Sequence, residues 1–530
     1  MQTAPPFDRM GLGPGEVTIL AMPRPKFDRH TWRAGGVARN TALTAISQVV
    51  RFGVAFAMLP LLIDHLGADR TGLLTFAITL TGYFTAVEYS LATSLTKYVA
   101  EFRATGEIER LNSFLRGNFL LMSAIGLLVA LVLGALGLFG ATDLFGEASL
   151  RNEAAPTIYV AALTALFYWP TRIGPAALQG LERYDLAAII AILASAATLA
   201  GVFVLTRETQ SVPVYAGFVG GVLILQNVVS GACAWPHLEI RRRVGSWLGP
   251  HLRSILSFGG ALFVIGMADT FVYSFDRTIL AALVGAAAIV VYEVAVRLQS
   301  AVRTVASLAG GALLSTASRL IAQGRAERLR ELVLIGSFLG VMITTPVAIL
   351  LMILAEPTIA IWVGHDYVQY ASYAQIFISI WIVAGNTSVL GAAVTGTGRL
   401  GLFALLAIAT AAVSLVLSVA FTAVWGTIGV ILGTVIPTFV ALPIWMYFAL
   451  RRVDVPIRQY TSYVVIPAYS FIAVWSGLVL LLNSVLSPRT FLGLAAFTIL
   501  TLLVLWLAAF PMTRTRWRRA ARGELVPDSA

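Results

Sequence analysis

The chain has 530 residues, of which 58% are hydrophobic and only 12% are charged, whereas roughly a quarter of an ordinary soluble domain is charged. This composition excludes a water-soluble globular protein and predicts a chain that is solvated mostly by lipid. The single cysteine, Cys233, excludes an internal disulfide, and the five histidines do not cluster, so we predict no metal site and no cofactor. The net charge of +11 is scattered over many short connections, which argues against nucleic-acid binding.

Fourteen apolar runs are long enough to cross about 30 Å of hydrocarbon, at roughly 20 residues for each crossing. Their approximate bounds are 42–63, 72–94, 115–139, 156–178, 186–206, 213–234, 254–275, 285–312, 331–354, 370–394, 400–424, 427–449, 462–483 and 490–511. Positive charge stays on the cytoplasmic side in short loops, and most of the 37 Lys and Arg residues are cytoplasmic if the N-terminus is inside. The outer connections then hold only Arg70, Arg151, Arg207, Arg277 and Arg489. We predict an all-α, multi-pass membrane protein of 14 transmembrane helices with both termini in the cytoplasm.

Two pairs of similar segments indicate an internal repeat. ATGEIERL from Ala104 and AQGRAERL from Ala322 share five of eight positions, and AALQGLERYDL from Ala176 and AAVTGTGRLGL from Ala392 share five of eleven. Both pairs follow spans that lie six apart. Because six is even, the second copy re-enters the membrane in the same orientation, as in parallel repeats related by an axis along the membrane normal. We therefore predict two six-helix lobes that face each other across a central cavity.

The repeat also predicts how the chain is divided. The first 39 residues have no apolar run followed by a small-residue cleavage site, so they are predicted to be an arm and not a signal peptide. The predicted units are a basic cytoplasmic arm (1–39), a first lobe of six spans (40–236), a cytoplasmic linker (237–252), a second lobe of six spans (253–450), two additional spans (451–512) and a basic cytoplasmic tail (513–530).

Charged residues inside the first two spans are candidates for a functional site. An arginine near the middle of a spanning helix costs about 2.5–3.5 kcal/mol on insertion scales, so such residues usually face a wet cavity or a partner. Arg51 lies about halfway along the first span, and Thr44 and Gln48 share its helix face. No acidic residue lies three or four positions from Arg51, so Arg51 and Gln48 are candidates for binding substrate. Glu88, in the second span, is a candidate partner of Arg51, a cavity residue or a coupling-ion site.

The second lobe carries charges of its own. Glu293 and Arg297 form an i, i+4 pair with the acid first, which is the more favourable order. Two interpretations stay open for this pair: a mutual salt bridge that lets the helix insert, or a part of the substrate cavity. Asp269, in the seventh span, is a further coupling-ion candidate. The step Asp276–Arg277, near the outer end of that span, is predicted to be a local structural pair.

Prolines inside the spans are a further feature of interest, because proline removes a backbone hydrogen-bond donor and can kink a helix. They include Pro60, Pro170, Pro346, Pro437 and Pro467. Since membrane helices tolerate proline well, we interpret them first as static packing features, with a role as hinges as the alternative.

Four stretches in the same order along the chain resemble a known family. They are LGADRTGLLTFAITLTGYFTAVEYSLATSLTKYVAEFRATGE from Leu66, AALQGLERYDL from Ala176, DRTILAALVGAAAIVVYEVAVRLQS from Asp276 and WGTIGVILGT from Trp425. Together they resemble the polysaccharide-flippase branch of the multidrug/oligosaccharidyl-lipid/polysaccharide exporter superfamily over about residues 40–450. Members of that family have two six-helix lobes, commonly with two added helices, as the repeat predicts.

The resemblance implies a carrier for undecaprenyl-pyrophosphate-linked oligosaccharide or lipid II in the bacterial inner membrane. Such a carrier would serve the biosynthesis of surface polysaccharide, lipopolysaccharide or exopolysaccharide. It implies a cationic central cavity, a role that carries over in general terms to Arg51 and Arg297. The implied partners are the lipid-linked glycan, membrane lipids and the polysaccharide polymerase machinery.

Two alternatives belong to other functional classes. A cation-coupled multidrug exporter of the same superfamily would use an intramembrane carboxylate such as Glu88 or Asp269. A membrane glycan polymerase or ligase would place its catalytic residues on a sizeable outer loop, and the outer connections here are short. We therefore predict that the chain is not an enzyme.

Overall fold

The computed structural model describes residues 34–82, 85–140, 150–238, 264–268, 274–385, 387–397, 400–486 and 488–521, and these ranges contain helices and no strand. The first half comprises α1 (Ala34–Gly82), α2 (Thr85–Thr105), α3 (Ile108–Phe139), α5 (Ala154–Thr171), α6 (Ile173–Gly180), α7 (Tyr184–Glu208), α8 (Val212–Ala234) and the 3-10 turn η1 (Trp235–His237). The second half begins with the helical segments 264–268 and 274–283. It continues with α10 (Ala286–Ala322), α11 (Ala326–Ile353), α12 (Ala355–Trp362), η2 (His365–Tyr370), α13 (Ala371–Ala384), α14 (Thr387–Gly396), α15 (Gly401–Trp425) and α16 (Thr427–Arg452). The last elements are α17 (Ile457–Tyr460), the π-helical turn η3 (Thr461–Val465), α18 (Ile466–Leu486) and α19 (Phe491–Ala521).

Nine helices in the described ranges are long and apolar enough to cross a membrane, or ten if the α13–α14 pair, bent by 52°, is one span. The predicted number of fourteen therefore stays a prediction. The predicted span 42–63 and the first part of 72–94 both lie in α1, which consists of two helices joined by a kink where Gly67 adopts φ 78° and ψ 173°. Most of the predicted seventh span, 254–275, lies outside the described residues, as do residues 1–33, 239–263 and 522–530.

The two copies of the repeat form the same turn. Gly106 and Gly324 have φ values of +72° and +66°, which glycine adopts without strain because it has no Cβ. The next residue in each copy donates its N–H back to the preceding helix, from Glu107 to Phe102 at 2.9 Å and from Arg325 to Leu320 at 3.0 Å. Helices α3 and α11 begin directly after these turns. The sequence repeat is thus also a repeat of local structure.

Three clusters of buried apolar side chains organise the bundle. One cluster draws on both halves, including Leu59 and Leu73 of α1, Trp169 of α5, Tyr292 of α10 and Ile359 of α12. The other two are confined to one half each, the first built on α2, α3 and α6, the second on α11, α14, α16, α18 and α19. The halves therefore share a core at the end of the bundle that holds the turn at Gly67 and helix α12. We call this the shared end, and the opposite end the separated end.

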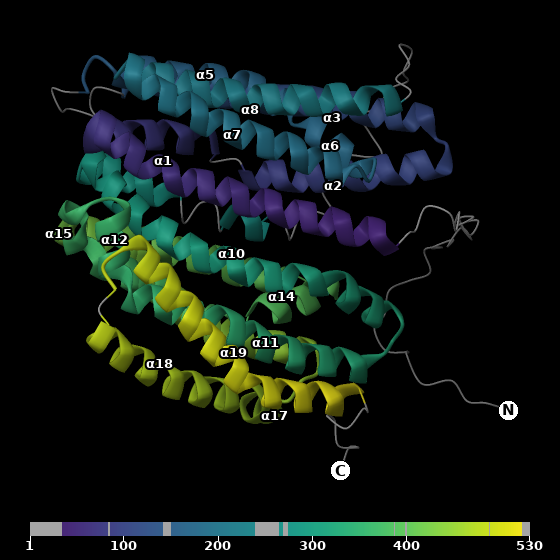
Figure 1. The fold of residues 1–530 in the computed structure, drawn as a ribbon. Helices are drawn as coiled ribbons and strands as arrows, with labels where there is room; N and C mark the ends of the chain where they lie inside the picture. Colours follow the sequence, from purple (N-terminus) through teal and green to yellow (C-terminus); the bar gives the residue numbers. More distant parts are fainter. Residues whose placement is uncertain are drawn as a thin grey trace.

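Figure 1 shows the first half, in purple to blue, above the second half in green, with α18 and α19 in yellow along the second half. The start of α1 and the end of α19 lie at the same end of the bundle, away from α12. Helix α19 is tied to α18 by a hydrogen bond from the indole Nε1 of Trp475 to the carbonyl oxygen of Thr501, at 2.9 Å. The lobe boundaries given by the sequence stay predictions, since the linker 237–252 lies mostly outside the described residues.

Close helix packing positions the polar groups of the second half. Gly429 and Gly433, four residues apart in α16, lie against the backbone of α15 at Phe421 and Ser418. A Cβ at Gly433 would lie 2.4 Å from Ser418 Cα, so neither helix could approach as closely with a larger residue there. Small residues at this spacing let membrane helices pack closely. Ser418 of α15 and Thr434 of α16 are thereby brought to one site.

Candidate functional site

The polar stripe predicted on the first span is exposed in the structure. Thr44, Gln48 and Arg51 of α1 are all exposed, whereas the adjacent Ser47 is buried. Arg51 lies eight positions before Leu59, the first α1 residue of the shared core, which is about 12 Å along a helix. Arg51 therefore lies beyond the shared core, on the side of the separated end.

The neighbours that act electrostatically on Arg51 are Arg172 and Tyr168. Arg172 follows the last turn of α5 and is half-buried, with its guanidinium carbon 5.8 Å from the centre of the Tyr168 ring. Within the described residues, no acidic side chain acts on Arg51 in the same way. Two guanidinium groups from helices more than a hundred residues apart therefore share one region of the first half.

The polar stripe of Thr44, Gln48 and Arg51 lies beside a row of α1 side chains that contacts the second half. Gln48, Phe52 and Phe56 are spaced by four residues, so they follow one another along the helix surface. The rings of Phe52 and Phe56 lie 5.9 Å apart, and Phe56 stacks on Trp362 of α12 with ring centres 3.8 Å apart and planes at 9°. Gln48 thus lies in a row that faces the second half, and Arg51 is less than one turn away.

The arginines of the second half are arranged differently, because they surround an acid. Glu293 of α10 is 5% exposed and contacts the guanidinium of Arg277 at 2.6 Å. Its other carboxylate oxygen lies 3.5 Å from Nε of Arg297. The predicted pair of Glu293 and Arg297 is present, but Arg277 is the nearer partner. Arg277 lies in the helical segment 274–283, where Asp276 acts on it electrostatically, and it also bridges to α10.

In the described part of the chain, the hydrogen bonds that Asp276 accepts come from hydroxyl groups. Its carboxylate accepts hydrogen bonds from Tyr292 Oη at 2.8 Å, Thr434 Oγ1 at 2.9 Å and Ser418 Oγ at 3.3 Å. These donors come from α10, α16 and α15, so the buried carboxylate joins three helices to the segment 274–283. A buried charge is tolerated where hydrogen bonds of this kind compensate its desolvation.

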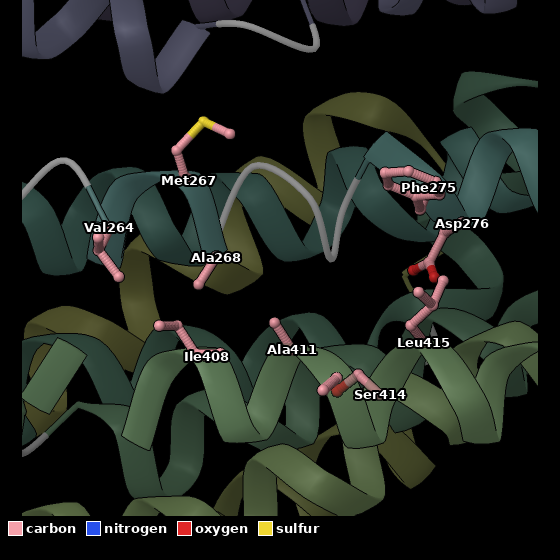
Figure 2. Close-up of a pocket in the computed structure, with 10 residues that line it drawn as sticks. Val264, Met267, Ala268, Phe275, Asp276, Ile408, Ala411, Ser414 and Leu415 are labelled. Atoms are coloured by element: carbon pink, nitrogen blue, oxygen red, sulfur yellow. The ribbon is translucent and has the colours of Figure 1, made fainter. Parts of the chain in front are cut away.

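A cavity of about 400 Å³ opens beside Asp276. Figure 2 shows Val264, Met267 and Ala268 on one wall and Ile408, Ala411, Ser414 and Leu415 of α15 on the other, with Phe275 and Asp276 at one end. The lining is apolar except for the Asp276 carboxylate and the buried hydroxyl of Ser414. This cavity lies inside the second half, and its lining includes neither Arg51 nor Arg297.

The remaining predicted site residues are Glu88 and Asp269. Glu88 lies in α2, and Asp269 lies outside the described residues. In the described ranges no group of three or more His, Cys, Asp or Glu side chains could hold a metal ion. The sequence prediction also missed Arg172, although this arginine falls inside the predicted fourth span, 156–178, and its position there was the available signal.

Comparison with known proteins gives the family and the fold. The family model described as polysaccharide biosynthesis protein matches residues 37–314, more than half of the chain. A search among curated proteins gave no match. The structure described as lipid II flippase MurJ in an inward closed conformation is similar with a TM-score of 0.65 and 14% identity, over 89% of this chain and 99% of that chain.

Two further solved structures share this architecture. An inward-facing multidrug resistance transporter of the MATE family has a TM-score of 0.60 and 15% identity, over 78% of this chain and 94% of its own. A MOP superfamily transporter from Pyrococcus furiosus, described by a reversed polarity of its binding pocket, has a TM-score of 0.58 and 15% identity, over 79% and 95%. At such identities the likeness establishes the fold alone, and it is that of the MOP superfamily transporters.

Proposed function

The chain belongs to the polysaccharide biosynthesis protein family, and we propose that it is a flippase for undecaprenyl-pyrophosphate-linked oligosaccharide. It would move this lipid from the inner to the outer leaflet of the bacterial inner membrane, for surface polysaccharide, lipopolysaccharide or exopolysaccharide. The observation that carries this proposal is the exposed guanidinium of Arg51 next to that of Arg172, beside the row of Gln48, Phe52 and Phe56 on α1.

The chemistry of the head group supports this assignment. A pyrophosphate presents several anionic oxygens, and guanidinium groups donate planar, paired hydrogen bonds to such oxygens. Two neighbouring guanidinium groups can both donate to a dianion placed between them. Gln48, on the same exposed stripe, can donate from its amide to a sugar or phosphate oxygen.

The asymmetry of the bundle supports a direction of entry. The halves share a core at one end and have separate cores at the other. With the termini in the cytoplasm, the separated end faces the cytoplasm, where the lipid-linked glycan is made. The head group would enter between the halves while the polyprenyl tail stays in the bilayer. Rocking of the halves would then expose the head group to the outside.

The driving force need not come from catalysis, and we expect the chain to have no enzymatic activity. Moving two negative charges outward across a membrane with an inside-negative potential of 100 mV is favoured by about 4–5 kcal/mol. Return of the empty carrier would use a cation, with Glu88 and Asp269 as the proposed coupling-ion residues. The glycan would then pass to the polysaccharide polymerase machinery in the outer leaflet.

The direct test is the sidedness of lipid-linked glycan in cells depleted of the protein. We expect the finished oligosaccharide to accumulate on the inner leaflet. Expression of the wild-type chain should restore its translocation, whereas a variant without Arg51 should not. Accumulation on the outer leaflet would instead indicate polymerisation or ligation, and would contradict the proposal.

A cation-coupled multidrug exporter is the second candidate, and one observation favours it. The cavity in the second half is apolar and carries the buried carboxylate of Asp276, which suits a lipophilic cation. Efflux of cationic dyes from cells that express the chain would support this candidate. An absence of efflux together with inner-leaflet accumulation of glycan would reject it.

A further inference from the structure

At the shared end, a side chain of the second half donates a hydrogen bond to a backbone carbonyl oxygen inside a helix of the first half. The indole Nε1 of Trp362, the last residue of α12, donates a hydrogen bond to the backbone carbonyl oxygen of Phe56 in α1 at 3.0 Å. The two rings also stack at 3.8 Å. One side chain of the second half thus makes both a polar and an aromatic contact with the first half.

The carbonyl of Phe56 is available because of the residue four positions later. In an α-helix, a carbonyl accepts from the N–H of residue i+4, and here that residue is Pro60, which has no N–H. A proline inside a membrane helix leaves a carbonyl that another group must satisfy. Trp362 supplies that donor from the opposite half of the protein.

Other contacts show that this is part of a tight seam. Gly72 of α1 lies so close to α10 that a Cβ there would be 2.0 Å from the carbonyl oxygen of Ala286. Leu59 and Ile359, which flank the Trp362 contact in sequence, are both fully buried in the shared core. The end of α12 is fixed by Gly364, whose φ of +102° turns the chain directly after Trp362 and Val363. Trp362 is therefore held in place from its own half.

We propose that Trp362 and the carbonyl freed by Pro60 form a latch that holds the outer side of the carrier closed. This rests on the proposed function, in which the shared end must open to release the head group. Opening would separate α1 from α12 and leave the Phe56 carbonyl with no helical donor. Water that enters the opened cavity would then be its only donor, so opening would be coupled to hydration of the outer cavity. Pro60 is on this view part of a gate and not only a kink.

The latch can be measured without any transport assay, as a distance between the halves. Spin labels at the exposed positions Arg151→Cys and Gln369→Cys, with Cys233→Ala to remove the native thiol, report separation at the shared end of the full-length protein in lipid nanodiscs. We expect mostly the short distance in the otherwise unchanged protein. Trp362→Phe keeps an aromatic ring but removes the donor, so the ratio of open to closed should rise about fivefold to tenfold, the effect of one hydrogen bond.

Two controls separate the hydrogen bond from general loosening. Trp381→Phe removes an indole N–H that has no hydrogen-bond partner among the described residues, and should leave the distances unchanged. Pro60→Ala gives the Phe56 carbonyl its own helical donor, so Trp362→Phe should have a much smaller effect in that background. An unchanged distance distribution in Trp362→Phe would overturn the latch, and so would an equal effect of Trp362→Phe with and without Pro60.

A binding measurement distinguishes failure of the latch from failure of the proposed function. Binding of an isoprenyl pyrophosphate can be measured on the unlabelled protein. If the protein with Pro60 and Trp362 intact does not bind it, the flippase proposal fails, whereas the open-to-closed ratios still decide whether the latch exists. If binding is normal and Trp362→Phe does not open the shared end, only the latch is rejected.

Discussion

The arginines of the two halves differ in their nearest charged neighbours. In the second half, Arg277 and Arg297 lie 2.6 Å and 3.5 Å from the carboxylate of Glu293, and all three side chains are at least three-quarters buried. In the first half, Arg51 is exposed, and the charged residue that acts on it is another arginine. Equal charges within one membrane protein thus occupy opposite electrostatic environments.

This difference separates a structural role from a binding role. A buried arginine with a carboxylate partner has its charge compensated, so it contributes to the fold and has little left for a ligand. An exposed arginine on which a second arginine acts gains from an anion that lies near both. We therefore expect the sign of the neighbouring charge, and not the position within a span, to distinguish the two roles.

The largest expected effect is on folding, from loss of the shared acid. Glu293→Gln would remove the carboxylate that contacts both Arg277 and Arg297, and breaking a buried pair in this way typically costs about 3–5 kcal/mol. We expect a clear fall in the midpoint of chemical denaturation in detergent. Glu107→Gln removes the acid of a partly exposed pair with Arg110 and should cost less than about 1 kcal/mol. Equal effects of the two variants would show that burial does not distinguish them.

The next effect is on ligand binding, from Arg51→Ala. Removing one charge-assisted contact of about 1.5–3 kcal/mol should weaken binding of an isoprenyl pyrophosphate roughly tenfold to a hundredfold, with no loss of folding stability. Arg116→Ala, at an exposed position of α3, is the matched control and should bind normally. Unchanged binding in Arg51→Ala, combined with a fall in stability, would make Arg51 a structural residue and remove the difference between the halves.

Arg297→Ala should have a smaller effect, and mainly on stability. Glu293 keeps its closer partner Arg277, so we expect a destabilisation of about 1 kcal/mol and binding of the isoprenyl pyrophosphate within about twofold of the wild type. Denaturation and binding measured on one preparation check both expectations. A loss of binding as large as that of Arg51→Ala would place Arg297 in the substrate cavity, which is the alternative that the sequence left open.

The smallest effect is expected from Arg51→Lys, which keeps the charge but removes the planar fork of donors. Binding of the pyrophosphate should weaken about threefold to tenfold, and addition of salt should weaken it further because a point charge is screened more easily. Titrations at two ionic strengths measure both the loss of affinity and its dependence on salt. A loss equal to that of Arg51→Ala would mean that geometry, and not charge, decides recognition.

Several features of the site were predictable because they depend on neighbours in sequence. The exposed stripe of Thr44, Gln48 and Arg51 follows from helical spacing, and so does the i, i+4 pair of Glu293 and Arg297. Arg172 could have been found from its place inside a predicted span. The contact between Arg277 and Glu293 could not, because sixteen residues and a turn separate them and only the packing of two helices sets their distance.

The sequence by itself determined the lipid environment, the helical class, the repeat and the family, because hydropathy, local spacing and short motifs are properties of neighbouring residues. The tertiary structure decided which arginines lie against a carboxylate, as Arg277 and Arg297 do. It also decided the meaning of Pro60, which in the sequence is one of several prolines in spans. Its freed carbonyl acquires a role only where Trp362, some three hundred residues later, approaches within hydrogen-bonding distance. Long-range packing sets such distances, and no local pattern records them.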